Sequence, residues 1–321
     1  MSHFRILSLD GGGTRGYLSI HLLANIEKYL NNKNNEQIPL GQRFDLIVGT
    51  STGAIIGGLL AIGKSAQEIA ELYEADIPEI FNPKQKRGWF SCLIRPKYDN
   101  QVLIKRANQY FKNLTFNDVK TDLIVTSVDI TQMQLRLHKS AFIERNKIRA
   151  DEKLANAIIA STSAPTFFPV ARKLDKSDYL IDGGITANNP AMVGLLDALD
   201  FDRKSKRGIQ PPENFNDILL LSIGTGKERV TPYNVNALLK AGLYRWARPL
   251  IELLMASQAK LVEYQVGALL NKTKAVYKRL NPDLTAKMPL DDINFSLLTN
   301  LADLKKTDTD WLDQYFKENN K

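Results

Sequence analysis

The sequence twice places a glycine-rich turn between a short apolar run and a longer helical pattern. The run Phe4–Leu9 leads into the turn Asp10–Gly16, after which leucines and isoleucines recur at helical spacing. The run Phe44–Val48 leads into the turn Gly49–Gly53 and a helix of small residues that extends through Ala61. Because a helix between two strands carries the chain back along the sheet, this repetition predicts neighbouring parallel strands.

The remaining periodic segments predict the rest of the fold. Further strands are predicted at Leu123–Asp129, Gln134–His138, Tyr179–Ile181 and Ile218–Ile223, with a helix at Ala191–Leu199. The spacing is helical from Val235 to Lys278, and Leu297–Phe316 predicts two short helices. The leucines available for a packed face in this part are Leu238, Leu239, Leu243, Leu250, Leu253 and Leu254. The sequence therefore predicts an α/β fold with a largely parallel central sheet, helices on both faces and a helical C-terminal tail.

Length and composition limit the class of protein. The chain has 321 residues, of which 44% are hydrophobic and 24% charged, which is enough for a large core and leaves little room for disorder. A single cysteine, Cys92, excludes an internal disulfide and fits a reducing compartment. The start of the chain has no signal-peptide pattern, and no apolar run reaches the roughly 18 residues that span a bilayer. We therefore expect a cytoplasmic protein whose contact with membranes is peripheral.

The net charge of +8 favours contact with an anionic partner, but it does not decide between lipid and nucleic acid. The sequence has no zinc-ligand spacing, RNP-like aromatic pattern or helix-turn-helix pattern. We therefore do not expect a nucleic-acid polymer as partner, and an anionic membrane surface remains the more specific expectation.

The turn at Gly49–Gly53 has the G-x-S-x-G pattern of a nucleophile elbow, with Ser51 at its centre. Gly49 and Gly53 allow a strained turn that lifts the Ser51 hydroxyl above the sheet, and the N-terminus of the following helix favours developing negative charge. A serine that is incidental to the turn is the alternative, because bare matches to this pattern are common. The strand before it and the small-residue helix after it favour a nucleophile.

The first turn contains Gly11, Gly12 and Gly13 and also satisfies G-x-G-x-x-G. A dinucleotide-binding site of this kind needs a second strand ending in an acidic residue about 20 residues further on, but the sequence continues with the polar run Asn31–Glu36. Consecutive glycine N–H groups can instead converge on an oxyanion, and Arg15 adds positive charge nearby. We expect an oxyanion-binding loop, with a purely structural turn as the alternative.

Asp182 follows the predicted strand Tyr179–Ile181 and precedes Gly183 and Gly184. An Asp-Gly pair is usually only a turn, but a nucleophilic Ser51 needs a base. Few histidines are available to act as that base, which favours a catalytic role for the Asp182 carboxylate.

The histidines of the chain are His3, His21 and His138, and none follows residue 138. In the order of α/β-hydrolase triads the histidine comes last. His138 lies on the polar face of an alternating strand, as expected for a solvated or hydrogen-bonded histidine. The base is therefore predicted to be a carboxylate. An aspartate such as Asp182 has an ordinary pKa of about 3.9, so a desolvated pocket would have to raise its pKa or hold it in tight contact with the serine hydroxyl.

Taken in order, these motifs resemble those of the patatin-like phospholipases, and the resemblance extends from about residue 4 to residue 226. Thr14 stands where an aliphatic residue is common in the family, a departure that leaves the backbone donors of the loop unaffected. The segments that carry the resemblance are Asp10–Gly16, Gly49–Gly53, Ala160–Pro169, Asp182–Gly184 and Asn188–Pro190.

The resemblance implies a patatin-like three-layer sandwich, with residues 1–230 as the catalytic domain and residues 231–321 as a helical region packed on it. It also implies a Ser51–Asp182 dyad without histidine, an acyl-enzyme, and phospholipase A, lysophospholipase or esterase activity that uses no metal or other cofactor. The oxyanion hole is expected at Gly11, Gly12, Gly13, Thr14 and Arg15, and the supporting motif residues are Gly16, Gly49, Gly53, Gly183 and Gly184.

Residues 84–97 surround apolar side chains with basic ones, and a membrane could be the partner of this segment. Lysine and arginine would meet anionic headgroups while Trp89, Phe90, Leu93 and Ile94 enter the acyl boundary. The alternative is a lid or loop whose apolar residues cover the domain's own core.

Other classes of function stay open on the residues alone. A nucleotide-binding enzyme rests on the first glycine loop, and a non-hydrolytic interaction protein is opposed by the presence of Ser51 and Asp182. An effector enzyme that stays inactive until a protein partner or small nucleotide binds is a further alternative, with the segment after Val235 as the place for such a site.

Overall fold

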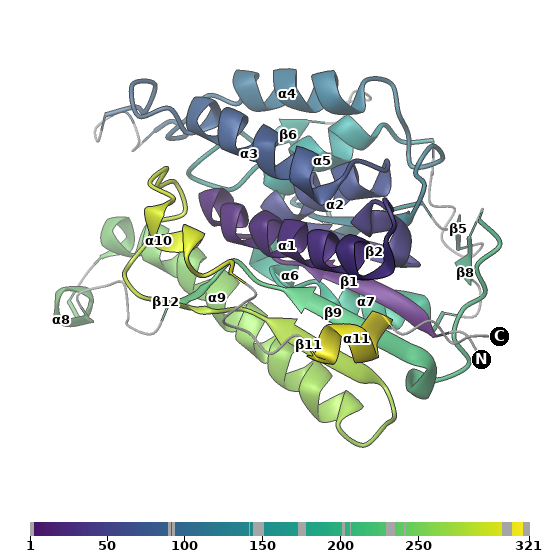
Figure 1. Cartoon of the computed structure of the whole chain (residues 1–321). Helices are drawn as coiled ribbons and strands as arrows, with labels where there is room; N and C mark the ends of the chain where they lie inside the picture. Colours follow the sequence, from purple (N-terminus) through teal and green to yellow (C-terminus); the bar gives the residue numbers. More distant parts are fainter. Residues whose placement is uncertain are drawn as a thin grey trace.

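The computed structural model has one eight-stranded sheet at its centre, in the order β11-β9-β1-β2-β3-β7-β6, with β4 also paired to β3 (Figure 1). The pairs that join β11, β9, β1, β2 and β3 are parallel, whereas β4, β6 and β7 pair antiparallel. The predicted largely parallel sheet is therefore confirmed. The strands of this sheet are β1 (Phe4–Leu9), β2 (Leu46–Thr50), β3 (Asp122–Asp129), β4 (Gln134–Lys139), β6 (Ala171–Arg172), β7 (Tyr179–Asp182), β9 (Ile218–Ile223) and β11 (Val276–Leu280).

The structure describes most of the chain. The described residues are 3–88, 91, 94–140, 142–143, 151–172, 178–200, 203–205, 207–228, 235–240, 242–303 and 310–316.

Helices cover both faces of the sheet, as predicted, with α1 to α5 on one face and α7 and α9 on the other (Figure 1). Successive residues of β1 point to opposite faces of the sheet. Leu7 therefore packs in the hydrophobic core beneath α1 to α5, and Ile6 packs in the core beneath α7 and α9. The helices are α1 (Gly16–Asn34), α2 (Thr52–Ala61), α3 (Ala66–Ile80), α4 (Gln101–Phe111), α5 (Leu154–Thr162), α6 (Gly184–Ala187), α7 (Ala191–Ala198), α8 (Val235–Leu238), α9 (Leu243–Leu270), α10 (Ser296–Thr299) and α11 (Asp310–Phe316).

Short elements complete the described structure. Two small sheets pair β5 (Phe142–Ile143) with β8 (Arg203–Lys204) and β10 (Lys227–Glu228) with β12 (Asp283–Leu284). Three 3-10 turns are Gly13–Arg15, Leu40–Arg43 and Phe215–Asp217. Among the described residues, no helix is long and apolar enough to cross a bilayer.

The register of the sheet brings the sequence motifs together. Leu9 pairs with Gly49, so the turns that follow β1 and β2 lie side by side at the carboxyl edge of the sheet. The antiparallel strand β7 pairs Asp182 with Ser127 of β3, directly after the point where Thr126 of β3 pairs with the end of β2. The three motifs therefore meet at one edge although Asp10 and Asp182 are 172 residues apart in sequence.

The helical prediction for Val235 to Lys278 is wrong at its C-terminal end, because residues 276–280 form β11, an edge strand parallel to β9. The mixed segment Val276-Tyr277-Lys278-Arg279-Leu280 lacks the apolar run expected of a strand. Its arginine is accommodated because Asp10, at the end of β1, lies opposite it as an ion-pair partner. The two short helices predicted for Leu297–Phe316 are confirmed by α10 and α11.

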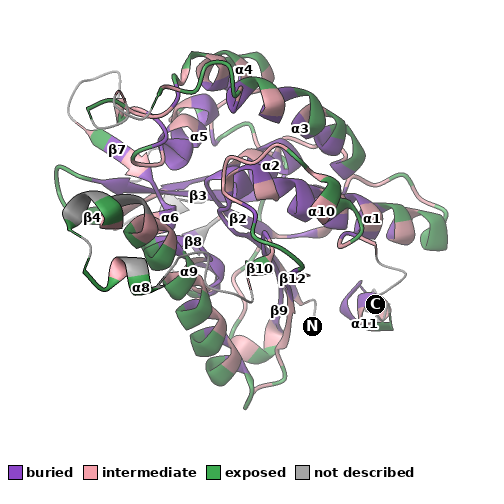
Figure 2. Cartoon of the chain, turned by 90° about the vertical axis from the view of Figure 1, so that its left-hand side faces the viewer, coloured by how far each residue is buried: buried purple, intermediate pink, exposed green. Residues whose placement is uncertain are grey.

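Several leucines of the C-terminal region do not form the packed face expected of them. The exposed fractions of Leu239, Leu250, Leu253 and Leu254 are 75%, 43%, 50% and 42%. Figure 2 shows α9 with much of its surface in the colour of exposed residues. Helix α9 is apolar around much of its circumference, and only one stripe can face the sheet. That stripe consists of Met255, Val262, Val266 and Leu270. The predicted boundary between residues 230 and 231 stays a prediction.

Candidate active site

Ser51 lies in the sharp turn between β2 and α2, with φ 54° and ψ −122°, a backbone conformation that non-glycine residues rarely adopt. The backbone of this turn is too close to its neighbours for side chains at the flanking positions. A Cβ atom at Gly49 would come within 2.4 Å of the carbonyl oxygen of Gly53, and one at Gly53 within 2.3 Å of the carbonyl oxygen of Leu9. The backbone N–H of Ser51 donates to the Ser161 hydroxyl at 2.8 Å, which steadies the turn.

The Ser51 hydroxyl contacts Asp182 directly. Ser51 Oγ donates to Asp182 Oδ2 at 2.6 Å, and the other carboxylate oxygen accepts the backbone N–H of Gly184 at 2.7 Å. Both side chains are buried, with 7% of Ser51 and 2% of Asp182 exposed. A Cβ atom at Gly183 would come within 2.2 Å of the Thr126 hydroxyl, so the close fit against β3 requires glycine after the aspartate.

Burial raises the pKa of Asp182 to about 6, although the hydrogen bonds from Ser51 and Gly184 lower it in part. Such a shift, or tight contact with the serine hydroxyl, is what an aspartate needs in order to act as a base. A carboxylate with this pKa is still ionised above neutral pH, and it accepts a proton more readily than an ordinary aspartate.

In the glycine loop after β1, two of the backbone N–H groups have no hydrogen-bond acceptor among the described residues. The N–H of Gly11 donates to the Asn188 carbonyl at 3.0 Å, and the N–H of Thr14 donates to the Leu290 carbonyl at 2.9 Å. Within the described residues, the N–H groups of Gly12 and Gly13 have no acceptor. Gly13 has φ 58°, so its left-handed conformation favours glycine at this position.

Asp10 at the start of this loop is held by an arginine that the sequence analysis did not single out. Arg279 Nη1 donates to Asp10 Oδ1 and to the Ser222 hydroxyl, both at 2.8 Å, and Nη2 contacts Asp10 Oδ2 at 2.5 Å. Arg15, which was expected to add charge to the oxyanion loop, contacts Glu228 at 3.1 Å. The position of Asp10 at the end of a predicted buried strand indicated that it needs a cationic partner. The sequence did not identify which arginine that partner would be.

Of the two expectations for His138, solvated or hydrogen-bonded, the structure supports the second. Its side chain is 1% exposed, and its ring nitrogens contact the Ser127 hydroxyl at 2.9 Å and Glu152 at 2.7 Å. Its two nitrogens are thus both engaged by groups other than Ser51. Among the described residues, no group of three or more histidine, cysteine, aspartate or glutamate side chains gathers as a metal site.

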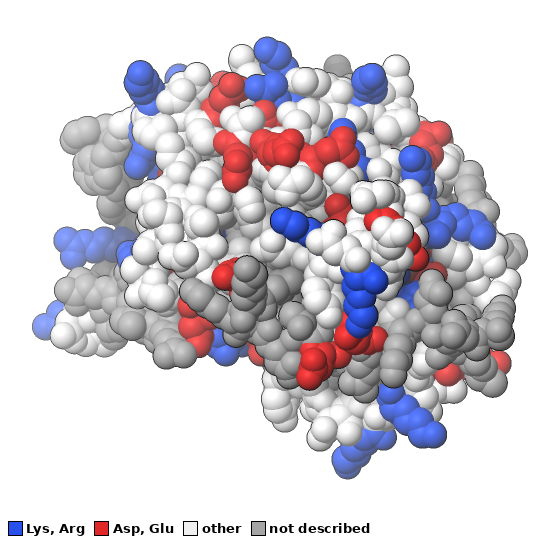
Figure 3. Space-filling view, viewed as in Figure 1, with Lys and Arg blue, Asp and Glu red and all other residues white. Residues whose placement is uncertain are grey.

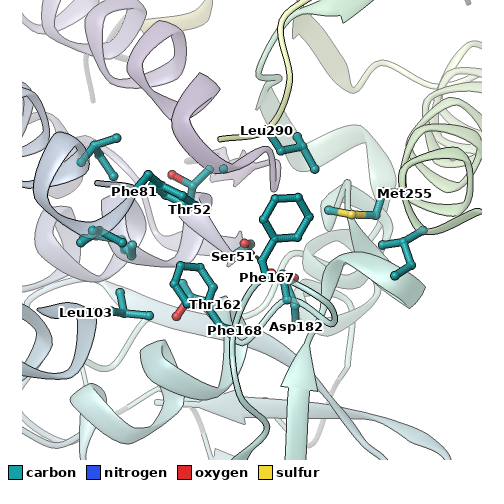
Figure 4. A pocket seen from close by; sticks show the side chains of 16 residues that line it. Ser51, Thr52, Phe81, Leu103, Thr162, Phe167, Phe168, Asp182, Met255 and Leu290 are labelled. Carbon is teal, nitrogen blue, oxygen red and sulfur yellow. Dashed lines mark hydrogen bonds between the residues drawn. The ribbon is translucent and has the colours of Figure 1, made fainter. Parts of the chain in front are cut away.

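An apolar pocket surrounds the pair of Ser51 and Asp182 (Figure 4). Phenylalanines from the segment after α5, leucine and isoleucine side chains of α3 and α4, and one face of α9 form its walls. The polar pair could be identified from the sequence but these walls could not, because they come from six separated segments. The apolar lining residues are Ile55, Ile77, Ile80, Phe81, Leu103, Ala164, Phe167, Phe168, Ile251, Met255 and Leu290.

Of the expected lipid-contact residues, only Ile94 belongs to the described part of the chain, and its side chain is 84% exposed. Trp89, Phe90 and Leu93 lie outside the described residues. On the face seen in Figure 3, lysine and arginine side chains are interspersed with aspartate and glutamate. The net charge of the chain is therefore not collected into one basic patch on that face.

Comparison with known proteins gives consistent matches. The sequence model of the family described as patatin-like phospholipase matches residues 7–195. A cGAMP-activated phospholipase of Vibrio cholerae serotype O1 is 30% identical, over 93% of this chain and 88% of the relative. Patatin-like protein 4 of Arabidopsis thaliana is 29% identical, over 93% of this chain and 81% of the relative.

Among solved structures, VipD from Legionella pneumophila aligns with 98% of this chain and 67% of its own, at 14% sequence identity and a TM-score of 0.46.

Proposed function

The chain belongs to the patatin-like phospholipase family, and we propose that it cleaves fatty acyl esters of membrane lipids with Ser51 as nucleophile and Asp182 as base. The observation that carries this proposal is the 2.6 Å hydrogen bond from the Ser51 hydroxyl to Asp182 at the base of an apolar pocket. The nucleophile and the base are in hydrogen-bonding contact, as this type of covalent catalysis requires.

In the proposed reaction, Ser51 Oγ attacks the ester carbonyl while its proton passes to Asp182. The tetrahedral intermediate collapses, the alcohol of the lipid leaves with that proton, and the acyl group remains on Ser51. Water then attacks the acyl-enzyme, Asp182 accepts the proton of the water, and the second collapse releases the fatty acid and returns the proton to Ser51.

The oxyanion of both intermediates needs donors that are in place before the reaction. The N–H groups of Gly12 and Gly13 are the candidates, since those of Gly11 and Thr14 already donate to protein carbonyls. Arg15 would contribute positive charge at longer range, because its guanidinium contacts Glu228. Loss of one such donor is expected to raise the barrier by about 3 kcal/mol.

The apolar pocket is the natural place for the acyl chain of the substrate. Phe167, Phe168 and Leu103 provide an apolar surface close to Ser51, whereas the polar groups in the pocket are few. Burial of each methylene against such a surface contributes about 0.8 kcal/mol, so a long acyl chain would bind more tightly than a short one.

Active-site labelling with a fluorophosphonate, measured beside the release of fatty acid from mixed phospholipid vesicles, tests the proposal. Wild type should be labelled and should release fatty acid, and Ser51→Ala should do neither while keeping its circular dichroism spectrum. Ser257→Ala is the matched control, because Ser257 is an exposed serine on α9 whose hydroxyl donates to the Leu254 carbonyl of the same helix. Undiminished labelling of Ser51→Ala would refute the assignment of the nucleophile.

A second proposal concerns activation. The Vibrio cholerae relative, which matches 93% of this chain, is named a cGAMP-activated phospholipase. We propose that a small nucleotide raises the activity of this chain above its basal level, so that fatty-acid release increases on addition of cGAMP while fluorophosphonate labelling still depends on Ser51. Equal release with and without cGAMP contradicts activation. Folded protein that is neither labelled nor active with cGAMP would favour a non-hydrolytic interaction protein.

A third proposal concerns the membrane. The exposed Ile94 and the basic residues around it support contact of residues 84–97 with an anionic bilayer. Ile94→Ser combined with Trp89→Ala should weaken sedimentation with phosphatidylglycerol vesicles. Hydrolysis of a monomeric short-chain ester serves as the control for folding. Unchanged vesicle binding would contradict the role of this segment.

A further inference from the structure

A second cavity, of about 470 Å³, lies beside the glycine loop. It is formed where the chain leaves three adjacent parallel strands: Gly11 and Gly12 after β1, Thr225 after β9 and Asn281 after β11. Helix α9 and residues 287–290 close its sides. Ligands of open α/β sheets bind outside the carboxyl ends of the strands, and this volume is in the range of small-molecule sites. We call this cavity the polar chamber.

The polar chamber adjoins the apolar pocket around Ser51 and Asp182 but differs from it in the chemistry of its lining. Met255 and Leu290 line both cavities, so they form the wall between them. The lining of the apolar pocket is almost wholly apolar, whereas charged side chains from β10, α9 and β11 line the chamber. A molecule with an apolar chain and a polar head could therefore reach both cavities from the glycine loop.

Asn188 lies at the inner end of the polar chamber with its side chain unsatisfied. Its exposed fraction is 7%, and within the described residues its Oδ1 atom is buried without a hydrogen-bond partner. A Cβ atom at Gly11 would come within 2.5 Å of this oxygen and within 3.2 Å of Ser51 Cβ, so the amide lies beside the nucleophile. Buried polar groups are normally hydrogen-bonded, and an orphan in a cavity indicates a ligand or bound water.

The charges of the polar chamber leave a surplus of positive charge. Its carboxylates Asp10 and Glu228 contact Arg279 and Arg15, and Glu263 lies 3.9 Å from Arg279. The ammonium groups of Lys227 on β10 and Lys260 on α9, by contrast, have no partner within the described residues. Glu252 and Lys287 complete the charged lining. Two unpaired ammonium groups from different elements of one cavity suit a phosphate.

We propose that the polar chamber binds the phosphodiester of a ligand, with Lys227 and Lys260 meeting the phosphate and Asn188 hydrogen-bonding to the group next to it. The ligand we assign is the headgroup of the phospholipid whose acyl chain occupies the apolar pocket. This assignment rests on the proposed function. A soluble phosphodiester such as a cyclic dinucleotide has the same chemistry, and the experiment separates the two sources.

The test compares two substrates with the same acyl chains, dihexanoylphosphatidylglycerol and dihexanoylglycerol, both below their micellar concentrations. For Lys227→Gln combined with Lys260→Gln, the ratio of kcat/KM for the phospholipid to that for the diacylglycerol should fall about tenfold. The matched control is Lys28→Gln combined with Lys105→Gln, which removes two exposed charges from α1 and α4. An equal fall in the control would overturn the proposal, because it would reflect net charge.

Binding measurements distinguish the source of the phosphodiester and do not depend on hydrolysis. Ser51→Ala should bind dihexanoylphosphatidylglycerol in a calorimeter, and addition of the two lysine substitutions should weaken this binding about tenfold. Loss of cGAMP binding instead, with phospholipid binding unchanged, assigns the chamber to a soluble phosphodiester and overturns the headgroup assignment. If the lysine substitutions change the binding of neither phospholipid nor cGAMP, the proposed phosphodiester site is overturned. If wild type binds phospholipid but does not hydrolyse it, only the proposed function is refuted.

Asn188→Ala separates a ligand-binding role from a structural one. Because the amide oxygen has no partner in the described structure, its removal should not lower the melting temperature, whereas the phospholipid-to-diacylglycerol ratio should fall. A lower melting temperature with an unchanged ratio would assign the side chain to folding and overturn its part in the proposal.

Discussion

Asp10 and Asp182 occupy equivalent local positions but have different partners. Each stands at the end of a strand before two glycines, each is at most 3% exposed, and burial is the main cause that raises the pKa of each carboxyl. Asp10 faces the guanidinium of Arg279, which opposes that rise through its charge and hydrogen bonds. Within the described part of the chain, the hydrogen-bond partners of the Asp182 carboxylate are the Ser51 hydroxyl and the Gly184 N–H.

The difference shows how a partner from a distant strand decides the chemistry of a carboxylate. The contact with a cation favours the ionised form of Asp10, against the effect of burial, and the ion pair connects the end of β1 to β11. Neutral partners leave Asp182 with a raised affinity for a proton, which is the property a base requires.

Asp182→Asn should reduce fatty-acid release by at least about 10³-fold, because the proposed proton acceptor for Ser51 is lost. The rate is measured on phospholipid vesicles, with circular dichroism to establish that the variant is folded. Asp10→Asn is the matched comparison, since it makes the same chemical change in the carboxylate that faces Arg279. Equal losses of activity in two folded variants would remove the distinction between the two sites.

Arg279→Met should lower the free energy of unfolding by about 3–5 kcal/mol, because Asp10 would remain buried without its cation. Urea denaturation at neutral pH measures the effect. The double variant with Asp10→Asn should recover part of the loss, since the uncompensated charge is then absent. A single variant as stable as wild type would mean that the ion pair does not hold β11 to β1.

Asp182→Asn should raise the free energy of unfolding at pH 8 by about 2–3 kcal/mol. Below pH 3.8 the carboxyl holds its proton in both states, and between pH 3.8 and about 6 only the folded protein retains it. The stability of wild type therefore falls as the pH rises through this window and the contribution is constant above it. Urea denaturation at pH 4 and pH 8 should give a difference between variant and wild type that grows with pH, and a constant difference would contradict the shift.

The pH dependence of kcat/KM should follow the ionisation of Asp182. Activity should be half-maximal near pH 6 and fall about tenfold for each unit below it, since the protonated carboxyl cannot accept the proton of Ser51. A soluble ester substrate avoids effects of pH on vesicles. A midpoint near pH 4 would show that desolvation does not tune this base.

Local sequence was sufficient for the elements that carry the motifs. The predicted strands over β1, β9 and most of β3, β4 and β7 are confirmed because each is a short apolar or alternating run bounded by turn residues. The predicted strand at Phe44–Val48 lies two residues early, since β2 continues to Thr50 and directly supports the elbow. Strand β11 was missed because its mixed sequence lacks an apolar run, and its partners, the strand β9 and the ion-pair residue Asp10, are distant in sequence.

The sequence by itself determined the order of turn and helix around Ser51, the glycines that such close backbone approach requires, and the candidacy of Asp182 in a chain with few histidines. These are local properties of backbone conformation and residue type. Tertiary structure alone decided the 2.6 Å contact of the pair, the walls of its pocket and the pairing of Asp10 with Arg279. Distances, desolvation and charge partners arise only when separated segments pack together, and no local pattern contains them.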